Sequence, residues 1–237
     1  MSLRVYEDKR EIAEAATLDF VERAQAAIRA SGRFAVALAG GSTPRTAYET
    51  LARDHAGSLD WSRVHVFFGD ERAVPPEHED SNYKMAKETM LDHLPIGSVH
   101  RMRGELPPEE AATEYEQDLR VFFGEPPRFD LVMLGIGGDG HTASLFPETP
   151  ALEVTDRLAV ANPVPRLDTT RITLTAPIIN AAGAVVFLVA GEDKAEALRE
   201  ILEGDADPHA YPAKLIQPNG DLVWMVDRNA ARLLARV

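Results

Sequence analysis

The sequence contains no cysteine among its 237 residues. Disulfides, thiolate nucleophiles and zinc–thiolate sites are therefore excluded by the residue inventory itself. The 7 histidines are scattered without metal-site spacing, and the pair His78 and Glu79 lacks the second histidine of a zinc-binding helix. There is also no Gly-x-Ser-x-Gly turn to present a serine nucleophile. We therefore expect any catalysis to use nitrogen and oxygen side chains without a metal ion.

Long apolar segments are missing as well. No segment approaches the roughly 18 uninterrupted apolar residues that a membrane-spanning helix needs. The N-terminal stretch MSLRVYEDKREIAEAA lacks the basic start and the apolar centre of a secretory signal peptide. These absences predict a cytoplasmic protein without a membrane partner.

Basic residues are in deficit. The chain has 25 lysine and arginine residues against 38 aspartate and glutamate residues, which gives a formal net charge of −13. This charge repels nucleic acid and anionic membrane at long range, so we expect neither as a partner. A small anionic substrate would need a local pocket where cationic side chains and backbone N–H groups gather. The composition is compatible with a monomer or a small homo-oligomer.

Several short apolar runs have the pattern of buried strands. They lack strict alternation, which is typical of strands covered on both faces, and stretches with helical periodicity lie between them. The predicted strands are Phe34–Leu38, Val64–Phe68, Leu131–Leu134, 172–174 and 185–189. The predicted helices are a segment with Leu18, Val21, Ala24 and Ile28 on one stripe, then 44–55 with Pro44 in its first turn, 81–94, 107–123 and a helix after Asp193.

This alternation predicts an α/β fold with a doubly wound, mainly parallel sheet and helices on both faces. The proline-bearing segment 148–168 is expected to form a small antiparallel addition. No linker divides the chain, so residues 1–237 are expected to form a single domain. Sheets of this kind place their sites at the carboxyl ends of strands. Four predicted strands end in polar turns that should meet at one edge of the sheet: 39–44, 69–72, 135–141 and 191–194.

The turn after Leu131–Leu134 reads GIGGDGHTASLFP. Its glycines match the Gly-x-Gly-x-x-Gly pattern of dinucleotide-binding loops. That motif must open a helix in a βαβ unit and must be followed by an acidic residue near the end of the next strand. Here Pro147 and Pro150 interrupt the segment, and Asp156 follows no helical pattern. We therefore do not expect a nicotinamide or flavin cofactor.

The same glycines let the backbone approach a substrate closely, with Asp139 and His141 projecting from the turn. Histidine has an ordinary pKa near about 6.5, which suits it to proton transfer at neutral pH. We therefore interpret His141 as a general base or acid, in preference to a structural histidine that binds backbone carbonyls. Asp139 has open roles: it orients His141, contacts substrate hydroxyls or only hydrogen-bonds its own turn.

The segment GGSTP joins a predicted strand to a predicted helix. Free N–H groups at a helix start favour an anion, so this loop is a candidate phosphate site that lacks a P-loop lysine. The alternative is an ordinary N-cap at Ser42 or Thr43, which needs no ligand. The doubled glycine favours binding. The candidate phosphate-binding residues are Gly40, Gly41, Ser42 and Thr43.

Arg72 and Lys194 each follow a strand-end turn. Two cations converging on the phosphate site would overcome the negative charge of the protein. Each alone is more typical of a solvated surface charge.

Four further polar residues have open roles. Asp70 and Glu71 could pair with the neighbouring arginine, or one of them could serve as a base. Asn82 could cap a helix or contact a sugar. Arg171 precedes a predicted strand and is likewise ambiguous.

Five motifs occur in order along most of the chain. They are AGGSTP (39–44), GDER (69–72) with VP (74–75) and SNY (81–83), GGDGHTASLFP (137–147), RITLT (171–175) and GxxK (191–194). In this order they make the chain resemble the 6-phosphogluconolactonases of the pentose phosphate pathway. The resemblance implies a fold shared with glucosamine-6-phosphate deaminases and ribose-5-phosphate isomerases.

The resemblance also implies an activity: hydrolysis of 6-phospho-D-glucono-1,5-lactone to 6-phospho-D-gluconate, with no metal or organic cofactor. Carried over by position, His141 is the base that takes a proton from the attacking water. Arg72 and Lys194 hold the phosphate of this small-molecule partner, and the loop at 42–43 lines the same pocket. By the same carry-over, three further residues contact the substrate or orient the site: Asp139, Asn82 and Arg171.

Two alternatives stay open. A sugar-phosphate isomerase or deaminase on the same fold would use Asp70 to move protons between sugar carbons. Those deaminases continue Ala-Phe-Asn-Glu-Pro after the histidine and its neighbour, whereas this chain reads ASLFP with Glu148 beyond the proline. This departure favours the lactonase. A non-catalytic sugar-phosphate sensor would keep the phosphate site without needing a base, and the intact turn at His141 speaks against it.

Overall fold

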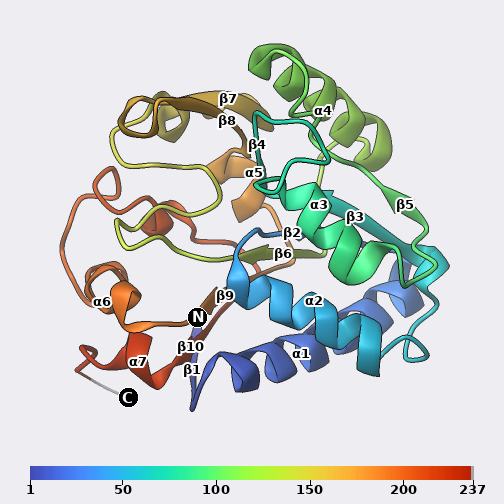
Figure 1. Ribbon diagram of the computed structural model, residues 1–237, viewed down its shortest axis with the longest axis horizontal. Helices are drawn as coiled ribbons and strands as arrows, with labels where there is room; N and C mark the ends of the chain where they lie inside the picture. Colours follow the sequence, from blue (N-terminus) through green and yellow to red (C-terminus); the bar gives the residue numbers. More distant parts are fainter. Residues whose placement is uncertain (236–237) are drawn as a thin grey trace.

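Four of the five predicted strands form the middle of a seven-stranded parallel sheet in the computed structural model, which describes residues 1–235 (Figure 1). The strand order is β1-β10-β9-β6-β2-β3-β5, and a second sheet of three antiparallel strands has the order β4-β8-β7. The strands are β1 (Ser2–Tyr6), β2 (Phe34–Leu38), β3 (Val64–Phe68), β4 (Asp70–Arg72), β5 (Ser98–Val99), β6 (Leu131–Leu134), β7 (Ala159–Val164), β8 (Thr169–Leu174), β9 (Ala184–Val189) and β10 (Asp221–Asp227). The helices are α1 (Lys9–Ser31), α2 (Ser42–Asp54), α3 (Asn82–Ala86), α4 (Pro108–Phe123), α5 (Ala176–Asn180), α6 (Ala195–Leu202) and α7 (Arg228–Ala231).

Helices cover both faces of the parallel sheet. Along β2, Phe34, Val36 and Leu38 pack into one apolar cluster, whereas Ala35 and Ala37 pack into another. Successive side chains of a strand point to opposite faces, so a continuous apolar run is what two covered faces require. The first cluster includes residues of α1, α2 and α3, and the second includes residues of α4, α5, α6 and α7. The α/β fold predicted from the sequence is confirmed.

The strand predicted at 172–174 exists, but it does not belong to the parallel sheet. It is the end of β8, which pairs antiparallel with β4 and β7 in the small sheet. Ile172 and Leu174 pack into the cluster that includes α4, and Thr173 is also buried. This burial on both faces gives the segment the same pattern as a central parallel strand. The antiparallel addition expected within 148–168 is present as β7 alone.

The prediction lacks three strands of the parallel sheet and misplaces one residue of α1. The strands are β1 and β5, at the two edges of the sheet, and β10, the neighbour of β1. On α1, Leu18 is 60% exposed, so its assignment to the buried stripe is wrong. Val21 and Ala24 are buried as predicted, together with Phe20.

Helix boundaries agree with the prediction within a few residues for α2, α4 and α6. The helix predicted at 81–94 is shorter, because regular α-helix ends at Ala86 and a wider π-helical turn follows at Lys87–Leu91. None of the helices within residues 1–235 combines the length and the apolar character needed to cross a membrane.

The order of the strands places the candidate site. After β2 the chain proceeds to β3 and β5 on one side of the sheet, and after β6 it proceeds to β9 and β10 on the other side. Strands β2 and β6 are neighbours, with Val36 opposite Leu131. The direction of winding therefore reverses between their carboxyl ends. Open α/β sheets bind ligands at such a point.

Candidate active site

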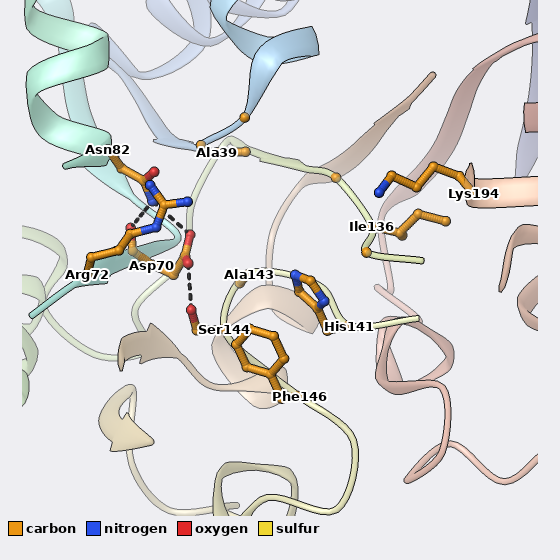
Figure 2. Close-up of a pocket in the computed structure, with 14 residues that line it drawn as sticks. Ala39, Asp70, Arg72, Asn82, Ile136, His141, Ala143, Ser144, Phe146 and Lys194 are labelled. Carbon is orange, nitrogen blue, oxygen red and sulfur yellow. Dashed lines mark hydrogen bonds between the residues drawn. The ribbon is translucent and has the colours of Figure 1, made fainter. Parts of the chain in front are cut away.

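A cavity opens where the chain leaves the carboxyl ends of β2 and β6 (Figure 2). Its volume of about 230 Å³ lies below the range typical of drug-sized ligands, so it suits a smaller ligand such as a sugar phosphate. All four segments predicted as turns contribute to its wall, which confirms that they meet at one edge of the sheet, although 70–72 forms strand β4 and is not a turn. The lining residues are Ala39, Gly40, Gly41, Asp70, Arg72, Asn82, Gly135, Ile136, Gly137, His141, Ala143, Ser144, Phe146 and Lys194.

His141 and Asp139 form a hydrogen-bonded pair at this cavity. Nδ1 of His141 lies 2.5 Å from Oδ1 of Asp139, and the same oxygen accepts the backbone N–H of His141 at 3.2 Å. Because an ionised carboxylate only accepts hydrogen bonds, Nδ1 carries the proton and Nε2 keeps its lone pair. The imidazole also stacks on Phe146, with 4.2 Å between the ring centroids and 30° between the planes. Asp139 thus both orients His141 and bonds its own turn, and it does not line the cavity.

The glycine turn serves this pair. A Cβ atom on Gly137 would lie 2.1 Å from Nδ1 of His141 and 2.4 Å from Oδ1 of Asp139, so only glycine allows the approach. The turn is closed by the N–H of Gly137, which donates to the carbonyl oxygen of His141 at 2.9 Å. Ala143 has a φ of 47°, in the left-handed region, where a residue with a Cβ is strained by roughly 1–3 kcal/mol. Strain of this kind is characteristic of functional turns.

His141 is held in its neutral form. Burial is the main cause that lowers the pKa of His141 to about 4, and the positive charges of Lys194, Arg171 and Arg72 act in the same direction. The carboxylate of Asp70 partly offsets them. Nε2 is therefore available as a proton acceptor at neutral pH.

Asp70 is buried and hydrogen-bonded to two side chains that also line the cavity. Its Oδ2 accepts the hydroxyl of Ser144 at 2.6 Å, and its Oδ1 accepts the amide of Asn82 at 3.2 Å; Figure 2 marks both bonds with dashed lines. Asn82 begins α3, but the N-cap of that helix is Ser81, whose hydroxyl accepts the N–H of Lys84. Of its two predicted roles, capping is therefore wrong for Asn82.

Glu71 organises the backbone beside the cavity. Its carboxylate accepts the N–H groups of Arg72, Asn82 and Tyr83, each at 2.8 Å, and the hydroxyl of Ser81 at 3.0 Å. Burial raises the pKa of Glu71, and these backbone hydrogen bonds act in the opposite direction. The pairing of Glu71 with the Arg72 guanidinium that the sequence allowed is not formed within residues 1–235. Glu71 instead fixes the start of α3 to β4.

Arg72 and Arg171 lie directly opposite each other in the pairing of β4 with β8. In each arginine the Nε atom is buried, and this atom has no hydrogen-bond partner in the part of the chain that the structure describes. Burial lowers the pKa of Arg171, and the charge of Arg72 adds to this effect. Like charges opposite each other destabilise a sheet, so this pair is suited to an anionic ligand.

Lys194 faces the cavity from the side opposite Arg72, with His141 between them (Figure 2). It lies immediately before α6, and its Nζ atom is 2.8 Å from Oδ2 of the exposed Asp193. The cavity therefore has a cation on each of two sides, although the protein as a whole is acidic.

The loop before α2 presents backbone to the cavity. Gly41 is the N-cap of α2 with φ 100° and ψ 170°, a conformation that favours glycine, and no side chain caps this helix. Ser42 and Thr43 are the first two residues of α2, so the alternative that either is the N-cap is wrong. Gly40 and Gly41 line the cavity, whereas Ser42 and Thr43 do not.

Three residues around the site had no role in the sequence prediction. Ser144 binds Asp70, Phe146 stacks on His141, and Arg166 forms an ion pair with Asp139. Ser144 and Phe146 lie in the motif at 137–147, which was the only signal for them. Within residues 1–235, no three histidine, aspartate or glutamate side chains are grouped to hold a metal ion.

The chain is similar to known proteins over nearly its whole length. Residues 7–224 match the family described as glucosamine-6-phosphate isomerases/6-phosphogluconolactonase. The chain is 46% identical over 235 residues to the 6-phosphogluconolactonase of Synechocystis sp., which covers 96% of this chain and 95% of the relative. The solved structure of 6-phosphogluconolactonase from Trypanosoma brucei matches with a TM-score of 0.89 and 30% identity, covering 99% of this chain and 98% of that one. A monomeric glucosamine-6-phosphate deaminase matches with a TM-score of 0.81 at 23% identity and 98% coverage of this chain and 100% of that one, which shows the fold alone.

The matched region contains all the residues that line the cavity, from Ala39 to Lys194. The sequence identity to the Synechocystis relative extends over both chains almost from end to end. The chain belongs to the 6-phosphogluconolactonase family of enzymes, within the larger group that includes the glucosamine-6-phosphate isomerases.

Proposed function

We propose that this enzyme hydrolyses 6-phospho-D-glucono-1,5-lactone to 6-phospho-D-gluconate in the pentose phosphate pathway, by water activated at His141 and without a metal ion or cofactor. The observation that carries the proposal is the neutral imidazole of His141, held by Asp139 at a cavity flanked by Arg72 and Lys194. A lactone is an ester, so its hydrolysis needs an activated water and stabilisation of the carbonyl oxygen. The names of the relatives support the same reaction.

The proton moves through one side chain. Nε2 of His141 takes a proton from water while the water oxygen attacks the carbonyl carbon of the lactone. The carbonyl oxygen gains negative charge next to cationic side chains and free backbone N–H groups. The bond from the carbonyl carbon to the ring oxygen then breaks, and the imidazolium returns its proton to that oxygen. The products are a new hydroxyl group and a carboxylic acid, which releases its proton to solvent.

Substrate binding changes the pKa of the base, His141. In the free protein the cations Lys194, Arg171 and Arg72 help to lower the pKa of His141. A phosphate dianion bound among them offsets their charge and raises the pKa of His141 toward neutral pH, where a general base is most effective. We therefore assign the phosphate to Arg72 and Lys194, which reach it from two sides of the cavity. The further proposed substrate contacts are Gly40, Gly41 and Asn82, which line the cavity, together with Ser42, Thr43 and Arg171, which do not line it in the free protein.

The alternative activity is that of a sugar-phosphate isomerase or deaminase on the same fold. It would require Asp70 as a carboxylate base and a second acid across the substrate. Asp70 is engaged by the hydroxyl of Ser144 and the amide of Asn82. Glu148, the nearest glutamate after the catalytic turn, does not line the cavity. These two observations favour the lactonase.

These activities are distinguished when one preparation of the protein is assayed with two substrates. Acid release from fresh 6-phosphogluconolactone is followed in weak buffer with the protein, with no protein and with His141→Ala, because the lactone also opens spontaneously. Ammonia release is followed with glucosamine 6-phosphate. We expect protein-dependent acid release and no ammonia. Ammonia release that Asp70→Asn abolishes, with no acceleration of lactone opening, would establish the deaminase, and binding of both compounds without turnover would establish a sensor.

The remaining proposals concern the location, the domain organisation, the oligomeric state and the partners of the enzyme. We propose a cytoplasmic protein with a single domain spanning residues 1–237, a monomer or small homo-oligomer that binds neither nucleic acid nor membrane. The net charge of −13 supports the absence of polyanionic partners. Limited proteolysis with size-exclusion chromatography tests the domain and the oligomeric state. A proteolytic fragment that stays folded by itself would contradict the single domain.

A further inference from the structure

Arg166 contacts the catalytic pair from outside the cavity. It lies in the short turn Pro165–Leu167 that joins β7 to β8. Its guanidinium forms an ion pair with Oδ2 of Asp139, whose other oxygen, Oδ1, binds Nδ1 of His141. Arg166 itself does not line the cavity. It is therefore placed to act on the reaction through Asp139 and not through the substrate.

The contacts close into a ring of four side chains. The guanidinium carbon of Arg166 lies 4.9 Å from the centre of the Phe146 ring, and the same ring stacks on His141. Each member of the set Arg166, Asp139, His141 and Phe146 therefore touches two others. Neither the carboxylate nor the imidazole can rotate without losing one of these contacts.

The hairpin that carries Arg166 is fixed to the catalytic turn at its base. On β7, the amide of Asn162 donates to the carbonyl oxygen of Ser144 at 2.8 Å. On β8, the hydroxyl of Thr173 accepts the backbone N–H of Ser144 at 3.2 Å. Because both strands of the small sheet hold Ser144, the hairpin presents Arg166 to Asp139 from a fixed position.

We propose that Arg166 is a positioning residue for the lactone hydrolysis proposed above, on which this inference rests. It holds the carboxylate of Asp139 in the orientation that keeps the Nδ1 proton of His141 on Oδ1 and directs Nε2 to the cavity. Its charge also balances that of Asp139, so the carboxylate orients the imidazole while favouring the imidazolium less than an unpaired carboxylate would. The small antiparallel sheet thus contributes to catalysis through a residue outside the substrate pocket.

The test compares Arg166→Gln and Arg166→Lys with the unaltered protein, by kcat, KM and the pH dependence of kcat/KM. For Arg166→Gln we expect kcat to fall by about tenfold, a coupling common among side chains in one hydrogen-bonded network. KM stays unchanged because no substrate contact is lost. The acid limb moves to higher pH, because the unbalanced carboxylate of Asp139 stabilises the protonated imidazole. Arg166→Lys keeps the charge and restores most of the rate.

Two controls separate positioning from folding. Leu167→Ala alters the neighbouring, exposed residue of the same turn and should keep the kinetics of the unaltered protein. Arg166→Gln should add no further loss in an Asp139→Asn protein, because its effect passes through Asp139. The other charged groups near His141 remain the same in every variant; they are Asp70, Arg72, Arg171 and Lys194.

Three outcomes would overturn the proposal. The first is a lower melting temperature for Arg166→Gln with unchanged kcat and acid limb, which is a structural role. The second is a raised KM with unchanged kcat, which is a substrate contact. The third is an additional loss in the Asp139→Asn background.

The positioning role can also be tested apart from the proposed function. If the unaltered protein does not open the lactone, that function fails, and the imidazole signals of His141 in NMR still test Arg166. Positioning predicts that Arg166→Gln raises the pH midpoint of these signals and reduces the share of the tautomer protonated at Nδ1. An unchanged midpoint and tautomer would overturn the positioning role by itself.

Discussion

Nδ1 of His141 lies 2.5 Å from Oδ1 of Asp139, while the same imidazole stacks on Phe146 with 4.2 Å between ring centroids. The first contact determines which ring nitrogen carries the proton, and the second determines the plane of the ring. Together they leave Nε2 as the ring nitrogen that is free to accept a proton. Gly137 makes the arrangement possible, because a Cβ atom there would overlap both members of the pair.

The acid limb of the pH profile should lie at a pH below the ordinary pKa of histidine. Burial and nearby cations lower the pKa of His141 to about 4, so the base is unprotonated above that pH and activity falls only as the pH approaches it. The measurement is kcat/KM against pH with unphosphorylated gluconolactone, because a phosphate group adds its own ionisation near about pH 6. An acid limb centred near about 6.5, the ordinary value for histidine, would contradict this prediction.

Asp139→Asn should reduce turnover without preventing folding. The amide no longer fixes the Nδ1 proton of His141, and in a serine protease the equivalent change costs up to about 10⁴ in kcat. Here we expect a loss of roughly 10²-fold or more, since the stacking on Phe146 still holds the ring. Asp70→Asn is the comparison, and it should be less damaging than His141→Ala. Equal activity of Asp139→Asn and the unaltered protein would remove the orienting role.

Arg72→Ala and Lys194→Ala should mainly weaken binding of the phosphorylated substrate. Loss of a charge-assisted hydrogen bond to phosphate costs about 1.5–3 kcal/mol, which is roughly ten- to a hundred-fold in affinity. The measurement compares phosphorylated with unphosphorylated gluconolactone on each variant. Retention of the full preference for the phosphorylated lactone by both variants would place the phosphate elsewhere, and loss in only one would place it on that side of the cavity.

Chelation should leave the activity intact. The chain has no cysteine, and residues 1–235 contain no cluster of three metal-binding side chains. The protein is treated with a strong chelator, dialysed and assayed for lactone opening. Loss of activity that zinc or magnesium restores would require a metal-bound hydroxide in place of water activated by His141.

The central strands could be predicted because their burial follows from local pattern. Strands β2, β3 and β6 coincide with apolar runs of the predicted bounds, since both faces of the sheet are covered. The edge strand β1 is partly exposed and mixes polar with apolar residues, so the same rule does not detect it. Strand β10 has the apolar run and satisfies the rule, so its omission is an error of the prediction.

The polar contacts of the site also divide into contacts that the sequence predicted and contacts that it did not. The pair Asp139 and His141 is two residues apart in one turn, and the sequence predicted both. Arg166 lies 27 residues from Asp139, and Ser144 lies 74 residues from Asp70. Contacts over such separations depend on how the small sheet packs against the turn that carries His141. No spacing rule in the sequence predicts this packing.

The most direct test of the account is the rate of acid release from fresh 6-phosphogluconolactone by His141→Ala and His141→Asn. Both variants should be folded, as shown by thermal melting, and both should lose roughly 10²–10⁴-fold in turnover, because neither side chain can accept the proton from water. KM should change far less than kcat, since the phosphate contacts remain. Acid release at the rate of the unaltered protein by a folded His141→Ala variant would contradict the account.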